Sequence, residues 1–282
     1  MQLHQIHRLF LEKLQPKFSV DEARFYLKSI LQSLFEIPPT DLALDPTRLI
    51  PEEQYQKLDR VAVQLLADVP LQQILGYCDF LDFTVKLSPD VLIPRPETEE
   101  LVEWLLDSYQ TFPTNVLDIG TGSGCIAIAL AKKWGQEAHI TALDKSPKAL
   151  AIAQKNAHLN GVQIDFVEQD MTQVWTFGNT WDLIVSNPPY VLLSEKEQMH
   201  ARVLEHEPHM ALFSPLQSAI YFYEAIHNQA LKFLSPQGWL YFEINPLCVS
   251  QLQALFSDQQ WMHFEVRNDT FGKARFLRVQ KQ

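Results

Sequence analysis

The sequence predicts an α/β protein in which a small helical bundle precedes a doubly wound, mostly parallel sheet of seven strands. Three observations support this fold class. Residues 1–76 show helical periodicity alone. From residue 115 onward, apolar runs of strand length alternate with helical periodicity, which is typical of a parallel sheet with helical crossovers. A glycine-rich turn, residues 120–124, directly follows the first of these strands.

The N-terminal region, residues 1–76, is expected to fold as a separate helical domain. The predicted helices cover residues 3–14, 20–34, 51–65 and 70–75. Pro38 and Pro39 end the second helix, and Gly76 ends the fourth. No residue type or spacing in this region indicates catalysis. We therefore interpret residues 1–76 as a domain that positions another molecule.

Residues 77–95 are expected to form a β-hairpin that links the two domains. Phe83, Val85 and Leu87 alternate with polar residues, and the apolar run 91–93 follows a Ser-Pro-Asp turn. The second predicted domain covers residues 96–282. It begins with a helix, because Pro96 and the acidic residues after it suit a helix start.

The second domain alternates strands and helices. The strands are predicted at residues 116–119, 140–143, 164–167, 182–186, 239–244, 264–267 and 274–279. The helices are predicted at residues 96–105, 126–134, 147–160, 219–234 and 249–256. Because only a few residues separate the last two strands, we expect them to be antiparallel to each other.

Composition and charge exclude several classes of protein. The net charge is −11, and acidic residues outnumber basic ones both before and after residue 95, so a large phosphate-binding surface is not expected. Cys78, Cys125 and Cys248 lie far apart without metal-ligand spacing, which indicates buried thiols in a reducing cytosol and no metal site. The amphipathic N-terminus is not a signal peptide, and no apolar run reaches membrane-spanning length.

A cofactor site is predicted where the first strand ends, at Gly120-Thr121-Gly122-Ser123-Gly124. Glycines at this position allow close approach of a ligand to the backbone. Asp144 ends the next strand, where a carboxylate can accept both hydroxyls of a ribose. Asp170 ends the third strand and is placed to accept from an adenine amino group, with Met171 against the ring. Because Asp118 precedes the loop, a sulfonium cofactor with an amino-acid tail fits better than a pyrophosphate.

A second site is predicted where the fourth strand ends, at Asn187-Pro188-Pro189-Tyr190. The two prolines have no N–H, so the turn presents mainly carbonyl oxygens. Asn187 adds an amide, and Tyr190 offers a flat face to a planar group. Such a site can hold a planar –NH2 group through both hydrogens. Since this turn lies at the carboxyl edge of the sheet, Asn187 is expected to contact the cofactor as well.

Together these residues resemble class I S-adenosylmethionine methyltransferases and, more narrowly, the HemK/PrmC family, the glutamine N5-methyltransferases of peptide chain release factors. The resemblance covers nearly the whole chain. Its motifs are Pro70-Leu71-Gln72-Gln73-Ile74-Leu75-Gly76, Ile93-Pro94-Arg95-Pro96-Glu97-Thr98-Glu99, Asp118-Ile119-Gly120-Thr121-Gly122-Ser123-Gly124, Ser186-Asn187-Pro188-Pro189-Tyr190, and Glu207-Pro208 with Ala211-Leu212. Asn-Pro-Pro-Tyr by itself is shared with nucleic-acid amino-methyltransferases, and the Pro-Arg-Pro-Glu-Thr stretch is far more specific.

The resemblance implies a Rossmann-like fold, S-adenosylmethionine as cofactor, and a substrate glutamine in the Gly-Gly-Gln loop of release factors. It implies that Gly120 to Gly124, Asp144 and Met171 bind the cofactor, and that residues 187–190 bind the glutamine side chain. Two departures from the family pattern concern loops. Residues 214–217 read Ser-Pro-Leu-Gln where glycines are usual. Asn245 replaces a glycine, and asparagine tolerates the left-handed conformation that a glycine would supply.

Two alternatives share parts of this pattern. An adenine or guanine amino-methyltransferase acting on RNA or DNA would use the same planar –NH2 and the same aromatic ring. Net charge and the absence of a basic target-recognition domain speak against it. A catalytically silent adaptor for release factors is disfavoured by the intact cofactor motif. We expect a cytoplasmic, monomeric enzyme whose partners are release factors, without direct nucleic-acid or membrane binding.

Overall fold

The computed structural model describes residues 1–109, 112–176, 178, 180–199, 201–215 and 218–282. The chain divides into two compact units, Met1–Tyr77 with Ala201–His206 and Cys78–His200 with Glu207–Gln282. Each unit buries an apolar core of its own. Within the described part of the chain, no helix has both the length and the apolar character that crossing a membrane would require.

The first unit is a helical bundle. Its helices are α1 (Leu3–Leu14), α2 (Val20–Phe35), α3 (Asp41–Leu44), α4 (Glu52–Leu66), α5 (Leu71–Leu75) and α9 (Ala201–His206). The four helices predicted before residue 77 are present, and the short α3 is an addition. The apolar stripe predicted along α1 is buried. Ser19 and Glu22 cap the start of α2 reciprocally, which satisfies backbone N–H groups that lack helical partners.

Helix α9 belongs to this first unit although it lies far along the chain. The Gln73 side chain donates to the His206 carbonyl. His206 Nε2 lies 3.1 Å from the Ala67 carbonyl oxygen, and the Arg202 guanidinium lies over the Phe18 ring. The sequence predicts no element at residues 201–206, because one and a half turns of mixed polarity give too short a periodic signal.

The second unit contains a seven-stranded sheet. Its strands are β3 (Asn115–Ile119), β4 (His139–Asp144), β5 (Asp165–Glu168), β6 (Trp181–Ser186), β7 (Leu234–Glu243), β8 (Trp261–Asn268) and β9 (Ala274–Lys281). They follow the order β5-β4-β3-β6-β7-β9-β8. Only β9 runs against the others in this sheet, pairing antiparallel with both β7 and β8. The predicted antiparallel pairing of the last two strands is therefore confirmed.

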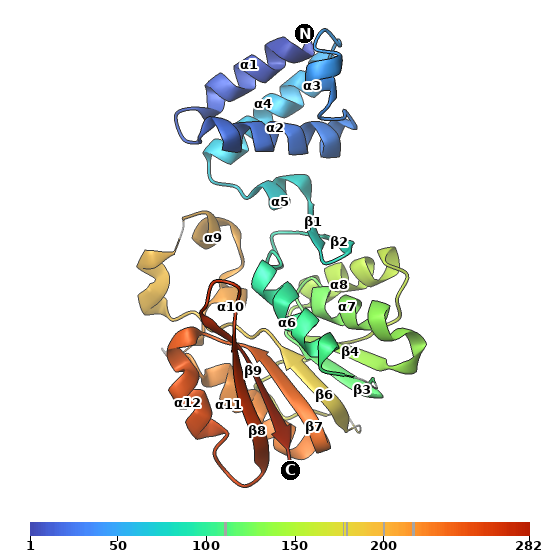
Figure 1. Ribbon diagram of the computed structural model, residues 1–282, viewed down its shortest axis with the longest axis vertical. Coiled ribbons are helices and arrows are strands. Elements are labelled where there is room, and N and C mark those ends of the chain that lie inside the picture. The colour runs from blue at the N-terminus through green and yellow to red at the C-terminus, as the bar shows by residue number, and fades with distance from the viewer. Residues whose placement is uncertain (110–111, 177, 179, 200, 216–217) are drawn as a thin grey trace. The chain divides into compact units, whose positions relative to one another are not determined.

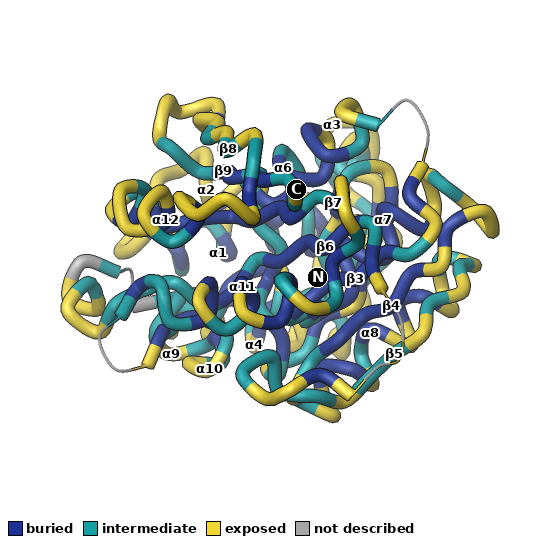
Figure 2. The backbone as a smooth tube through the Cα atoms, turned by 90° about the horizontal axis from the view of Figure 1, so that it is seen from below, coloured by how far each residue is buried: buried dark blue, intermediate teal, exposed yellow. Residues whose placement is uncertain are grey.

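Helices cover both faces of this sheet (Figure 1). One face carries α6 (Pro96–Asp107), α7 (Cys125–Trp134) and α8 (Pro147–Leu159), and the other carries α11 (Tyr221–Phe233) and α12 (Val249–Leu255). Alternate strand residues enter opposite cores: Val116 packs under α6 and α7, and Leu117 packs against α11. Figure 2 shows the resulting band of buried backbone along β3, β4, β6 and β7. This is the predicted doubly wound fold.

The linking hairpin is present, but its strands are not the predicted ones. It consists of β1 (Tyr77–Phe80) and β2 (Phe83–Lys86), joined by Leu81 and Asp82. The predicted second strand at residues 91–93 is wrong. Pro89 and Pro94 bracket that run and remove donors from any ladder. The Ile93 N–H is instead satisfied by the Glu207 carboxylate at 3.3 Å.

The strand order places two predicted sites beside each other. β3 pairs with β4 on one side and with β6 on the other, so the crossovers diverge at β3 and β6. Ligands in open α/β sheets bind outside the carboxyl ends of strands at such a switch point. The glycine-rich loop follows β3 and the Asn-Pro-Pro-Tyr turn follows β6, so both lie at this position.

Candidate active site

The glycine-rich loop adopts a conformation that only glycine takes up readily. Gly120, Gly122 and Gly124 have φ values of 72°, 56° and 85°. Gly124 also lets α8 approach, because a Cβ atom there would lie 3.1 Å from the Ala153 Cβ. The loop is further held by α8, whose Asn156 side chain donates to the Ser123 carbonyl at 2.8 Å.

Asp118 lies beneath this loop and holds it through one carboxylate oxygen. Its Oδ2 accepts from the Thr121 hydroxyl at 2.6 Å and from the Ala127 N–H at 3.3 Å. The side chain is fully buried. Burial raises its pKa to about 7, although the two hydrogen bonds act in the opposite direction. These two bonds anchor the loop to the start of α7.

This raised pKa predicts a pH-dependent stability. Unfolded Asp118 has an ordinary pKa near 3.8, so between about pH 4 and 7 the folded state retains a proton that the unfolded state releases. Stability contributed by Asp118 should fall as pH rises through this window, by about 1.4 kcal/mol for each unit between the two pKa values. Asp118→Asn carries no titrating proton. Urea unfolding from about pH 4 to 7 should show a flatter pH dependence for the variant, and parallel curves would contradict this.

Asp144, at the end of β4, joins the loop to α8. Its Oδ2 accepts from the Gly122 N–H at 3.0 Å, and its Oδ1 accepts from the Ser146 N–H at 2.9 Å. Burial raises the pKa of this carboxyl, while these bonds and Lys145 oppose the rise. Asp144 lines a pocket at the carboxyl edge of the sheet. Each oxygen keeps a further lone pair for a ligand donor.

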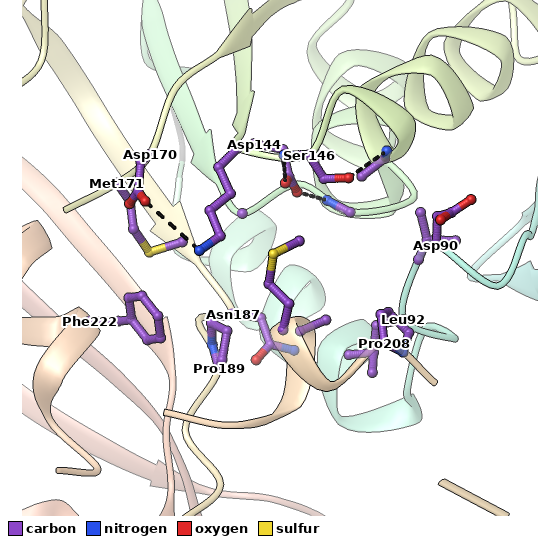
Figure 3. A pocket seen from close by; sticks show the side chains of 17 residues that line it. Asp90, Leu92, Asp144, Ser146, Asp170, Met171, Asn187, Pro189, Pro208 and Phe222 are labelled. Atoms are coloured by element: carbon purple, nitrogen blue, oxygen red, sulfur yellow. Dashed lines mark hydrogen bonds and ion pairs between the residues drawn. The ribbon is translucent and has the colours of Figure 1, made fainter. Parts of the chain in front are cut away.

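The wall of this pocket that follows the carboxyl end of β5 contains both acidic and apolar side chains. Asp170 Oδ1 accepts from the Thr172 N–H at 2.9 Å and from its hydroxyl at 2.8 Å. Although partial burial acts in the opposite direction, these bonds and Lys145 keep the pKa of Asp170 below its usual value. Figure 3 shows Met171 and Phe222 on this side of the pocket. They offer a polarisable and an aromatic surface to a flat ring.

The opposite wall contains Leu92 and Pro208 (Figure 3). A salt bridge between Arg95 and the buried Glu207 joins the two segments that carry these residues. The other Glu207 oxygen accepts from the Ile93 N–H. Arg95, which belongs to the Pro-Arg-Pro-Glu-Thr motif, therefore holds the two segments of this wall together.

The turn after β6 completes the pocket through Asn187 and Pro189. Asn187 Nδ2 donates to the Glu243 carboxylate at 2.8 Å and to the Thr98 hydroxyl at 3.1 Å. The Tyr190 hydroxyl donates to the other Glu243 oxygen at 2.9 Å. The amide nitrogen of Asn187 thus donates its hydrogens inside the protein. Its carbonyl oxygen remains available to accept a hydrogen bond from a ligand in the pocket.

The structure brings most of the predicted site residues to one pocket. Those that line it are Gly120, Gly122, Asp144, Asp170, Met171, Asn187 and Pro189. The remaining predicted residues, all within the described part of the chain, adjoin these but are not among the lining residues: Thr121, Ser123, Gly124, Pro188 and Tyr190. The site of β6 and the site of β3 therefore form one continuous cavity.

Sequence reasoning missed Thr98 and Glu243 as parts of the site. Thr98 belongs to the Pro-Arg-Pro-Glu-Thr stretch, so the family motif already pointed to it. Glu243 is the last residue of β7, and the register Ser186↔Phe242 places it beside Asn187 on the neighbouring strand. A charged residue at the carboxyl end of a predicted buried strand was the signal that could have identified it.

The two loop departures have different outcomes. Asn245 has φ −73°, so it does not use the left-handed conformation that asparagine tolerates. Its side chain instead caps the Leu247 N–H at 3.0 Å and donates to the Tyr190 carbonyl at 3.2 Å. In residues 214–217, Leu216 and Gln217 lie outside the described residues. Ser214 is buried, and its hydroxyl donates to the Ser218 carbonyl.

Comparison with known proteins agrees with this arrangement. The PrmC N-terminal domain family matches residues 8–76, and the methyltransferase small domain family matches residues 97–212. A release factor glutamine methyltransferase of Flavobacterium psychrophilum is 39% identical over 96% of both chains. The enzyme of the same name from Bacteroides thetaiotaomicron is 36% identical over 98% of this chain and 99% of its own.

Among solved structures, a 16S rRNA N2 G1207 methyltransferase of T. thermophilus in complex with AdoMet and guanosine aligns with a TM-score of 0.53 and 20% identity. The alignment covers 73% of this chain and 50% of that one, and it supports the methyltransferase fold. The two release factor glutamine methyltransferases are more closely related to this chain than that structure is, because they are more than 30% identical to it over almost the full length of both chains. The chain belongs to the release factor glutamine methyltransferase family.

Proposed function

We propose that this protein transfers a methyl group from S-adenosylmethionine to the side-chain amide nitrogen of the glutamine in the Gly-Gly-Gln motif of peptide chain release factors. The observation that carries the proposal is the Asn187 amide, whose nitrogen is bound internally while its oxygen remains at the pocket. Such an oxygen accepts a hydrogen bond from a substrate N–H. The substrate assignment is supported by relatives with this name that match the chain almost end to end.

The pocket residues fit S-adenosylmethionine. Asp144 offers carboxylate oxygens to a ribose diol, and Asp170 can accept from the adenine amino group. Met171 and Phe222 suit the flat adenine ring. Three of the four charged residues that line the pocket are acidic, which favours a cation over a pyrophosphate. When bound, the cofactor supplies a methyl group on a positively charged sulfur.

The chain's own residues would act by positioning. Asn187 Oδ1 and the Pro188 carbonyl accept the two N–H groups of the substrate amide, which directs the nitrogen lone pair toward the cofactor side of the pocket. The same two oxygen dipoles favour positive charge on that nitrogen as its new bond to carbon forms. An N-protonated amide is a strong acid, so its extra proton passes to water after transfer without a dedicated base.

Methyl transfer from radiolabelled S-adenosylmethionine tests this function directly. We expect label in purified release factor and not in RNA or DNA, and mass spectrometry should find one added methyl on the Gly-Gly-Gln peptide. A release factor with that glutamine changed to asparagine is the matched control. Labelled nucleic acid with unlabelled release factor would overturn the proposal in favour of a base amino-methyltransferase.

We propose that residues 1–76 bind the release factor at a surface other than the loop that carries the reacting glutamine. Deleting them should leave S-adenosylmethionine affinity near normal, because every pocket residue lies in the second unit. Turnover of the intact release factor at low concentration should fall more than turnover of a short Gly-Gly-Gln peptide. Equal losses for the two substrates would show that these helices only stabilise the catalytic unit.

We also propose that the enzyme works as a monomer in the cytoplasm without binding nucleic acid directly. Cys78, Cys125 and Cys248 are free thiols, as is usual in a reducing compartment. A net charge of −11 disfavours contact with a phosphate backbone. Light scattering on the purified protein tests the monomer, and a nucleic-acid binding assay at low salt tests the last point.

A further inference from the structure

The carboxyl group of Glu243 lies at the centre of a buried hydrogen-bond network. Only 2% of the residue is exposed. It accepts from the Thr98 hydroxyl at 2.7 Å, from Asn187 Nδ2 at 2.8 Å and from the Tyr190 hydroxyl at 2.9 Å. These donors come from the start of α6 and from both ends of the Asn-Pro-Pro-Tyr turn. Glu243 therefore ties together the parts of the proposed substrate site.

Donor and acceptor roles in this network fix which way the Asn187 amide faces. The Thr98 hydroxyl gives its hydrogen to Glu243 and so can only accept from Asn187. Both groups that surround the inner end of the amide are then acceptors. Turning the amide over would place Asn187 Oδ1 against a carboxylate and a hydroxyl lone pair. Because only the nitrogen can face inward, the oxygen is left for the pocket that Asn187 lines.

A purely structural role does not account for a carboxyl group at this position. Burying one costs stability unless it is well compensated, and desolvation raises the pKa of Glu243 while the bonds from Thr98 and Tyr190 oppose the rise. Arg275 helps electrostatically but is itself bound to Asp269 at 3.2 Å. The flanking Phe242 and Ile244 are buried apolar residues. An unusual buried carboxyl beside a pocket is a candidate functional group.

We propose that Glu243 is a positioning residue that locks the Asn187 amide with its oxygen toward the pocket and so makes the site select an N–H donor over a carboxylate. The inference rests on the proposed function and adds the basis of its discrimination between glutamine and glutamate. A glutamate side chain would meet two acceptor oxygens, and behind them a Glu243 carboxyl that already accepts from Thr98, Asn187 and Tyr190. A substrate amide instead satisfies both acceptors with its two hydrogens.

A double-mutant cycle tests whether Glu243 acts through Asn187. Single-turnover rates on the release factor are compared for Glu243→Ala, Asn187→Ala and the double variant. Glu243→Ala should lose about 10- to 100-fold in rate with little change in cofactor affinity. If Glu243 works by orienting Asn187, the double variant should be as slow as Asn187→Ala alone. Multiplied losses in the double variant would overturn the inference, as would an unchanged rate in folded Glu243→Ala.

Glu243→Gln and Thr98→Val keep the test usable if Glu243→Ala does not fold. A glutamine can still accept from Thr98 and Asn187 through Oε1 and can donate to the Tyr190 oxygen. Glu243→Gln should therefore retain more activity than Thr98→Val, which removes an acceptor of Asn187 at constant shape. The reverse order would count against orientation as the cause.

Competition by a release factor that carries glutamate in place of the glutamine measures selectivity. Wild-type enzyme should be inhibited weakly. In Glu243→Ala the amide is free to turn its nitrogen outward, so inhibition should strengthen by about tenfold, and the added Asn187→Ala change should abolish this gain. Thr98→Val keeps the Glu243 carboxyl against the amide nitrogen, so its gain should be smaller. Unchanged inhibition in folded Glu243→Ala would overturn the inference. A wild type that does not methylate the glutamine at all would overturn the proposed function instead.

Discussion

Asn187→Asp is expected to lower kcat on the release factor about as much as Asn187→Ala, by about 10²–10³-fold. Shape alone suggests otherwise, because aspartate keeps an oxygen that can accept from the substrate. The structure decides the matter, since Asn187 Nδ2 donates to Glu243 at 2.8 Å. In the aspartate variant two carboxyl groups would meet at that distance in a buried site. One must take up a proton or both must move apart, and either outcome misplaces the acceptor.

Asn160→Asp is a matched control for this loss. Asn160 also uses its amide nitrogen for two acceptors, the Thr84 carbonyl at 3.1 Å and the Asn156 carbonyl at 2.9 Å, but it lies outside the pocket lining. That variant should lose some thermal stability and keep its kcat. Calorimetry should show near-normal cofactor affinity for both aspartate variants. An Asn187→Asp enzyme that turns over like the wild type would remove Asn187 from the reacting centre.

The position of the site could be predicted from the sequence because it depends on strand ends. The glycine-rich loop and the Asn-Pro-Pro-Tyr turn each follow a short apolar run, and a doubly wound sheet brings such ends together. Most of the strand and helix bounds likewise agree within a few residues, since periodicity within one element is a local property. Sequence order did not reveal that Thr98, Asn187 and Glu243 meet, because they come from three elements far apart in the chain.

The incorrect predictions of local structure have a common physical origin. A short stretch of sequence can form hydrogen bonds that its own pattern does not reveal, and these bonds then decide its conformation. Residues 91–93 look like a strand, yet the Ile93 N–H binds the Glu207 side chain and the flanking prolines prevent a ladder. Asn245 looks like a substitute for glycine, yet it caps Leu247 from an extended conformation.

Asp144→Ala is expected to weaken S-adenosylmethionine binding by about 10- to 200-fold, which corresponds to about 1.5–3 kcal/mol for one hydrogen bond to a charged acceptor. Two effects combine in this variant. The proposed bond to a ribose hydroxyl is lost, and the Gly122 and Ser146 N–H groups lose the carboxylate that holds the loop against α8. Isothermal titration with S-adenosylmethionine measures the loss, which should appear in affinity more than in single-turnover rate at saturating cofactor.

Asp182→Ala separates ligand contact from simple loss of a structural carboxylate. Asp182 Oδ2 accepts from the Thr114 and Asn115 N–H groups at 3.1 and 3.0 Å, so it performs the same backbone task at the opposite edge of the sheet. Both variants should therefore lower the melting temperature, but only Asp144→Ala should lower cofactor affinity. Equal affinity losses would trace the effect to general destabilisation of the sheet. Wild-type affinity in a folded Asp144→Ala protein would exclude Asp144 from the cofactor site, leaving Asp170 and the loop backbone to hold the nucleoside.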